Sequence, residues 1–138
     1  MNTNMNFFVV AFVLSVTLVL GQNNPRFEEY FRGSGQKCRP YSGADEDNLN
    51  TLLQFGKLTT KTQACLAYCT LNSAGLQNGT DYDVEKGVEL YKYIYEQDEK
   101  RFKSAEATVK MCVADAQKQG RNDPCHAAEV LYNCFRDN

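Results

Sequence analysis

The stretch DPCHAAEVLYNCF, residues 123–135, carries two cysteines with eight residues between them in a helical pattern. Asp123 and Pro124 suit the N-cap and first turn of a helix, so we predict that a helix begins here. Nine positions at about 100° each leave Cys125 and Cys134 on opposite faces, roughly 13 Å apart along the axis. This exceeds the Cα separation of about 7 Å that a disulfide tolerates. In an oxidising environment each thiol must therefore pair with a different neighbouring element.

The first 21 residues bear on the redox compartment. They contain the uncharged apolar run FFVVAFVLSVTLVLG, residues 7–21, which is too short to span a bilayer comfortably. Val19 and Gly21 supply small residues for cleavage before Gln22. We interpret residues 1–21 as a secretory signal peptide, although Lys and Arg are absent before the apolar run, and residues 22–138 as one exported domain. A membrane anchor or a buried core helix is the alternative.

Cysteine usage and charge exclude several classes of site. Six cysteines in a short exported chain form an even set, which favours a disulfide framework. A zinc site would require close thiol pairs or His partners, whereas the chain has one His and no C-x-x-C motif. With 15 basic and 17 acidic side chains the net charge is −2, and no basic patch indicates nucleic acid or a membrane surface. The sequence thus predicts no metal, no cofactor, no nucleic-acid partner and no membrane insertion.

Apolar residues recur with helical spacing along the exported part of the chain. They predict a first helical segment from Pro25, interrupted by Gly33 and Gly35 before Cys38, and five more over 45–55, 61–74, 84–96, 102–116 and from 123. Residues 77–83 are predicted to form a polar loop, and no stretch alternates with period two for long enough to predict a strand. We therefore expect a single all-α domain of about six helices.

Helix geometry leaves several cysteine pairings open. Cys65 and Cys69 lie four positions apart on one helix, which disfavours a bond between them, and Cys125 cannot reach Cys134. Each exclusion removes three of the fifteen pairings of six cysteines, and one pairing is removed by both, so ten remain. The periodicity does not choose among these ten.

The spacing of the cysteines, with gaps of 26, 3, 42, 12 and 8 residues, is itself distinctive. It resembles that of the six-cysteine insect odorant-binding proteins of the pheromone-binding and general odorant-binding family. The gaps of three and eight residues are that family's most specific marks, and here they stand in ACLAYCTLNSAGL, residues 64–76, and in DPCHAAEVLYNCF. The loop QNGTDYDVEKG, residues 77–87, also looks like the family's turn between its third and fourth helices.

The resemblance implies about six helices around an apolar cavity, with bridges Cys38–Cys69, Cys65–Cys125 and Cys112–Cys134. It implies a secreted carrier that binds small hydrophobic volatile molecules, odorants or pheromones, and transports them through aqueous lymph. The implied partners are this ligand and an olfactory receptor, and the protein would be a monomer or weak homodimer. A secreted scavenger of the same fold, in salivary, venom or reproductive fluid, is the alternative.

Helix faces, together with the family's positions relative to the cysteines, give a predicted ligand-binding set. Most of its members would line the cavity, and tyrosine and threonine hydroxyls would supply one or two hydrogen bonds. The set is Leu71, Ala74, Leu90, Tyr91, Ile94, Ala105, Thr108, Val109, Val113, Val130 and Phe135. For each residue, ordinary core packing is the alternative. Tyr93, about 200° from its neighbours Tyr91 and Tyr95, is expected to face solvent.

The sequence contains no pattern of nucleophile, base and orienting group, so we predict no enzymatic activity. A phospholipase-like hydrolase would need a His beside a carboxylate and a Gly-rich calcium loop, whereas His126 lies in CHAAEV and is expected to be exposed. Asn78, Gly79 and Thr80 form an N-glycosylation sequon, and the sequence leaves open whether Asn78 carries a glycan.

Overall fold

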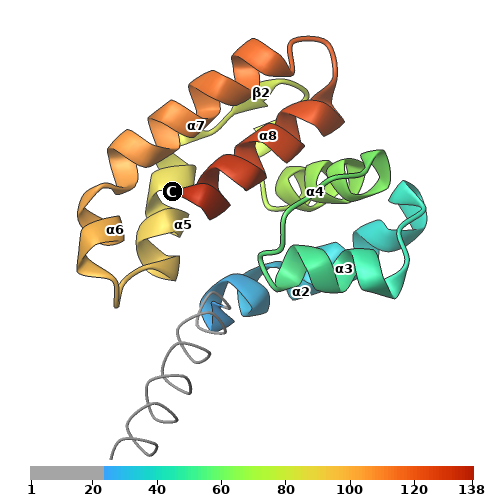
Figure 1. The fold of residues 1–138 in the computed structure, drawn as a ribbon, viewed down its shortest axis with the longest axis horizontal. Helices are drawn as coiled ribbons and strands as arrows, with labels where there is room; N and C mark the ends of the chain where they lie inside the picture. Colours follow the sequence, from blue (N-terminus) through green and yellow to red (C-terminus); the bar gives the residue numbers. More distant parts are fainter. Residues whose placement is uncertain (1–23) are drawn as a thin grey trace, which may run out of the picture.

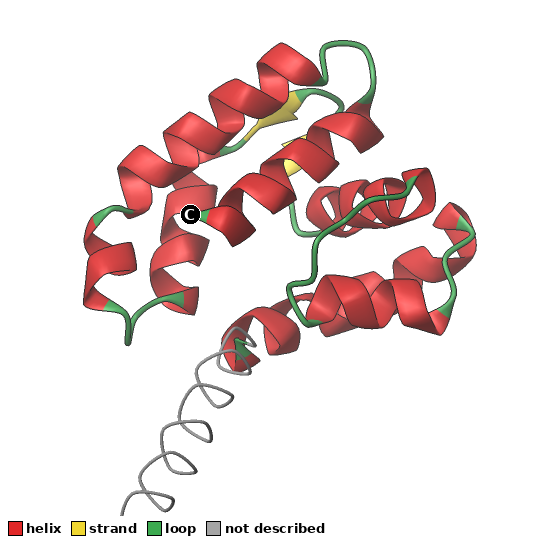
Figure 2. Cartoon of the chain, viewed as in Figure 1, coloured by secondary structure: helices red, strands yellow, loops and turns green. Residues whose placement is uncertain are grey.

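The computed structural model describes residues 24–138, which form seven helices and one short hairpin (Figures 1 and 2). The predicted signal peptide, residues 1–21, lies outside the described residues. The hairpin pairs β1 (Gln77–Asn78) with β2 (Asp81–Tyr82). The helices are α2 (Pro25–Ser42), α3 (Glu46–Leu53), α4 (Lys61–Ser73), α5 (Val84–Ile94), α6 (Glu99–Lys103), α7 (Ala105–Gln119) and α8 (Pro124–Asp137). The prediction of an all-α domain is confirmed for this part of the chain.

Side-chain caps fix where six of these helices begin. In each case a side-chain oxygen of the N-cap residue accepts a hydrogen bond from a backbone N–H of the first turn, which would otherwise lack a partner. At α8 the Asp123 carboxylate accepts from the backbone N–H groups of Cys125 and His126, at 3.0 and 3.2 Å, as the sequence predicts. The capping residues are Asn24, Asp45, Thr60, Asp83, Asp98 and Asp123.

Helix α2 is continuous through both glycines and Cys38, so the predicted interruption before Cys38 is wrong. Gly35 is buried, and a Cβ at this position would lie 2.7 Å from Cδ1 of Leu49 in α3. The glycine therefore allows close packing of two helices instead of ending one. That packing outweighs the roughly 1 kcal/mol that a glycine costs in a helix. The helix ends at Gly43, where φ is 72° and a residue without Cβ is favoured.

The single helix predicted through residues 102–116 is in fact two helices, α6 and α7. Ser104 separates them as the C-cap of α6 and the N-cap of α7. Because of this break Phe102 does not continue the buried stripe of α7; its side chain is 39% exposed, with the Lys92 amine 5.6 Å from the ring centre. The predicted polar loop 77–83 contains the hairpin, whose strands of two residues each are too short to show a period of two.

Helix α8 lies between α7 and α4, and a disulfide joins it to each of them (Figure 1). Cys125 pairs with Cys65 of α4 and Cys134 with Cys112 of α7, at Cα separations of 4.5 and 5.5 Å. A third bond, Cys38–Cys69, joins α2 to α4. No cysteine is free in residues 24–138. The two thiols of α8 reach different neighbours, as their opposite faces require, and the three pairs are those that the resemblance implies.

Candidate ligand-binding cavity

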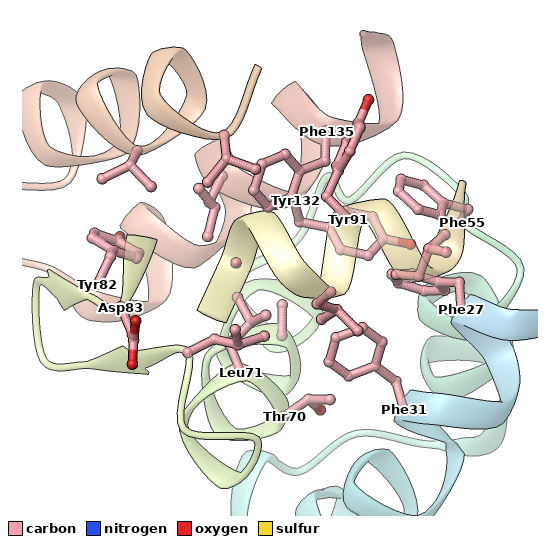
Figure 3. A pocket seen from close by; sticks show the side chains of 18 of the residues that line it. Phe27, Phe31, Phe55, Thr70, Leu71, Tyr82, Asp83, Tyr91, Tyr132 and Phe135 are labelled. Carbon is pink, nitrogen blue, oxygen red and sulfur yellow. The ribbon is translucent and has the colours of Figure 1, made fainter. Parts of the chain in front are cut away.

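An almost wholly apolar cavity of about 60 Å³ lies inside the helical bundle (Figure 3). Every described helix except α6 contributes to its wall, as does strand β2. The wall consists of Phe27, Phe31, Leu52, Phe55, Ala67, Thr70, Leu71, Leu76, Tyr82, Asp83, Gly87, Leu90, Tyr91, Ile94, Tyr95, Val109, Val113, Leu131, Tyr132 and Phe135.

Aromatic rings make up one end of the cavity. The ring centre of Phe27 lies 4.8 Å from that of Phe31 and 4.3 Å from that of Phe55, and Phe55 stacks on Tyr132 at 5.1 Å. Figure 3 shows Phe27 and Phe55 at one end and Tyr82 with Asp83 at the other. Offset and tilted ring pairs at these distances stabilise the wall beyond the effect of their buried area.

The loop between α3 and α4 brings Phe55 to the cavity with a backbone conformation that is rare for a bulky residue, at φ 58°. Helix α8 holds this loop in place. The Asn133 side chain accepts from the Leu58 backbone N–H and donates to the Leu58 carbonyl, both at 3.0 Å. Arg136 Nε donates to the Phe55 carbonyl at 2.9 Å. These bonds are made by side chains of α8, so the position of the loop depends on the position of that helix.

Two of the hydroxyl groups in the wall are satisfied within the protein. Thr70 Oγ1 donates to the Leu66 carbonyl at 2.8 Å, and the Tyr132 hydroxyl donates to the Leu52 carbonyl at 2.6 Å. Burial raises the pKa of Tyr132 above its ordinary value, with Arg136 opposing the rise.

Two other hydroxyls of the wall are buried without a hydrogen-bond partner in residues 24–138, those of Tyr82 and Tyr91. Burial raises the pKa of Tyr82 to about 12. Burial also raises the pKa of Tyr91, and Arg101 and Thr108 oppose this rise without removing it. Thr108 lies near Tyr91, yet no hydrogen bond with acceptable geometry forms between the two side chains. Both tyrosines are therefore neutral donors at physiological pH.

Seven of the eleven residues predicted to bind ligand lie in the cavity wall: Leu71, Leu90, Tyr91, Ile94, Val109, Val113 and Phe135. Their helix faces converge because α4, α5, α7 and α8 pack around one interior. Their role in binding remains a prediction.

The other four predicted residues lie outside the wall, and helix geometry explains why. On α7, Thr108 points about 120° away from the mean direction of Val109 and Val113, while the short side chain of Ala105 is fully buried at the start of the helix. On α8, Val130 points about 150° away from the face that carries Leu131, Tyr132 and Phe135. Ala74 caps the end of α4, after which the chain turns at Gly75, and it is Leu76 that reaches the wall.

The prediction missed the aromatic end of the cavity. Phe27 and Phe31 are four residues apart on the buried face of α2, a signal that the sequence did contain. Phe55 follows the last residue of α3 by two positions and owes its place to its left-handed backbone, which no periodicity reveals. Leu131 and Tyr132 share a helix face with Phe135, so extending the predicted face of α8 would have found them.

The remaining expectations concern the surface. Tyr93 is 47% exposed and His126 is exposed, as predicted, with the His126 Nδ1 4.0 Å from Glu129 Oε2. Asn78 is exposed at the end of β1. Within residues 24–138 no helix has the length and apolar character needed to cross a bilayer, and no group of three His, Cys, Asp or Glu side chains is placed to hold a metal ion.

The fold and cavity define a class: a small helical protein, cross-linked by three disulfides, with an apolar interior cavity. The family model of the PBP/GOBP family matches residues 21–138, so the chain belongs to the PBP/GOBP family. A comparison with curated proteins found no significant match.

Two solved structures are similar to this one. An odorant-binding protein from Drosophila melanogaster matches with a TM-score of 0.67 and 26% identity, over 79% of this chain and 88% of that chain. A pheromone-binding protein from the cockroach Leucophaea maderae, in complex with the fluorescent reporter 1-anilinonaphthalene-8-sulfonic acid, matches with a TM-score of 0.68 over 82% of this chain and 95% of that chain. At 22% identity the second likeness concerns the fold alone. Both relatives are binding proteins by name.

Proposed function

We propose that this protein is a secreted carrier that binds small hydrophobic volatile molecules without covalent chemistry and transports them through an aqueous fluid. The observation that carries the proposal is the almost wholly apolar cavity inside a chain of the PBP/GOBP family. The likeness to the fly odorant-binding protein supports it.

The driving force for binding is the transfer of apolar surface out of water. Each buried methylene contributes about 0.8 kcal/mol. A micromolar complex requires about 8 kcal/mol, so a ligand of about ten carbon atoms is sufficient. The cavity of about 60 Å³ is small for such a ligand, and we propose that side chains of the wall change rotamer to admit it. Leu90 and Phe135 of the wall are only half-buried, which leaves their side chains room to do so.

Export is part of the proposal. The apolar N-terminal run is the expected signal peptide, and the three disulfides are stable in an oxidising extracellular fluid. In sensillar lymph the expected recipient of the ligand is an olfactory receptor. Expression in salivary, venom or reproductive tissue would instead favour the scavenger.

We also propose a monomer or weak homodimer. Large exposed apolar side chains are dispersed over α2, α5, α6 and α7, and single residues of this kind need no partner. These side chains are Tyr30, Tyr41, Tyr93, Phe102 and Met111.

Displacement of a neutral fluorescent probe tests the carrier function. N-phenylnaphthylamine should bind to the purified mature protein, and volatile alcohols, aldehydes, esters or aromatics should displace it. Val113→Phe places a ring in the cavity and should weaken binding, whereas Ala114→Phe, on the exposed side of the same helix, should not. If the folded protein binds neither the probe nor any apolar competitor, the carrier function is refuted.

A further inference from the structure

Tyr82 and Tyr91, two residues of the cavity wall, each carry a hydroxyl that finds no hydrogen-bond partner within residues 24–138. Tyr91 is only 4% exposed, and each hydroxyl oxygen is buried without a partner in the described part of the chain. Buried hydroxyls normally have a hydrogen-bond partner, because removing them from water is otherwise costly. By contrast, the hydroxyls of Thr70 and Tyr132, in the same wall, both donate to backbone carbonyls.

The two tyrosines lie in different regions of one cavity wall. Tyr82 ends β2, just before α5 begins, and Tyr91 lies in the last turn of α5. The seven residue steps from Val84 to Tyr91 rise about 10 Å along the helix axis. In Figure 3, Tyr82 lies at the end of the cavity beside Asp83, and Tyr91 lies farther along, toward Phe55. A ligand that satisfies both hydroxyls must therefore present acceptors at separated positions.

The charges of the wall restrict the ligand further. Among the residues that the structure describes, Asp83 is the one charged residue that lines the cavity, and no Lys, Arg or His does so. A ligand with an ionised carboxylate would lose its hydration in the cavity without gaining a pairing cation. At the Tyr82 end it would also approach the carboxylate of Asp83. A neutral acceptor such as a ketone or ester oxygen meets neither penalty.

We propose that Tyr82 and Tyr91 determine ligand specificity, and that the preferred ligand is a neutral, elongated molecule with an apolar body and an acceptor oxygen toward each end. This inference rests on the proposed carrier function. A ligand without acceptors would leave these buried donors unpaired. Such a cavity therefore discriminates between ligands more strongly than a cavity that recognises only the size of an apolar ligand.

The test uses three competitors of equal chain length against bound N-phenylnaphthylamine: a straight-chain alkane, its methyl ketone, and the diketone with a carbonyl near each end. In the mature wild-type protein we expect the affinity to rise about tenfold from alkane to ketone and again from ketone to diketone. Tyr91→Phe and Tyr82→Phe should each remove one of these steps, and the double variant should bind all three competitors about equally.

Two controls separate recognition from structure. Tyr93→Phe, on the exposed face of α5, should leave the series unchanged. Because the hydroxyls of Tyr82 and Tyr91 have no hydrogen-bond partner in the described residues, their removal should not lower the melting temperature, whereas removal of a hydroxyl that is bonded within the protein would. An equal affinity for ketone and diketone, or a series unaffected by both substitutions, would overturn the inference while leaving the carrier function intact. A folded protein that binds no probe at all would refute the carrier function and the inference with it.

Discussion

Replacing Asn133 with Ala should loosen the loop that brings Phe55 to the cavity. The substitution removes two hydrogen bonds of 3.0 Å, one to the backbone N–H and one to the carbonyl of Leu58, a residue that is 1% exposed. A buried group left without its partner costs about 1 to 3 kcal/mol, and partial access of water to these groups favours the lower half of that range. The expected loss for the two groups is about 3 kcal/mol of unfolding free energy.

Thermal denaturation followed by circular dichroism measures this loss. At about 4 °C per kcal/mol for a domain of this size, the melting temperature should fall by roughly 12 °C. Probe affinity should fall as well, because the ring of Phe55 is in the cavity wall. Asn50→Ala, at an exposed position of α3, is the matched control and should change the melting temperature little. A fall of less than about 3 °C for Asn133→Ala would show that these two bonds do not hold the loop.

Three further predictions concern the cross-links, the buried tyrosines and the C-terminal turn. Replacing Cys65 and Cys125 together by Ser should lower the unfolding free energy by about 4 kcal/mol, measured by urea denaturation, because their loop of 60 residues is the longest of the three. Burial raises the pKa of Tyr82 to about 12, whereas an unfolded tyrosine titrates near 10. The stability that comes from the neutral side chain is therefore complete below pH 10 and is lost as the pH rises from about 10 to 12. Tyr82→Phe should flatten this decline in melting temperature with pH. Removing residues 136–138 should weaken probe binding equally at pH 7 and pH 5, because the hydrogen bond from Arg136 to the Phe55 carbonyl is lost at both. A tenfold loss of affinity at pH 5 that only the full chain shows would contradict this prediction.

The sequence predicted most of the helices because caps and periodicity acted together. Asp123 with Pro124 marked the start of α8, and Gly75 marked the turn after α4. The disulfide pairs came from a family resemblance and not from physics, since helix geometry left ten pairings open. The break at Ser104 was missed because it contains neither Gly nor Pro, and the apolar spacing continues across it.

The cavity was predicted only in part, because its wall depends on how helices face one another. Val109 and Val113, predicted from their helix face, lie in the wall, whereas Thr108 on the same helix does not. Phe55 could not have been predicted, since its place follows from a left-handed backbone and from a bond that Arg136 makes over a separation of 81 residues. Contacts of this kind exist only once the chain has folded.

The three disulfides also determine which parts of the cavity wall are free to move. They join α2 to α4, α4 to α8 and α8 to α7, so four helices form one covalently linked frame. Helix α5 carries no cysteine, although Leu90, Tyr91 and Ile94 in the wall belong to it. Its C-terminal end is held to α2 by hydrogen bonds, from Asn24 Nδ2 to the Ile94 carbonyl at 3.1 Å and from Arg26 to the Tyr93 carbonyl at 2.8 Å. We therefore expect α5 to shift more readily than the four linked helices when a ligand enters or leaves, because hydrogen bonds and side-chain packing, and no disulfide, hold it to the frame.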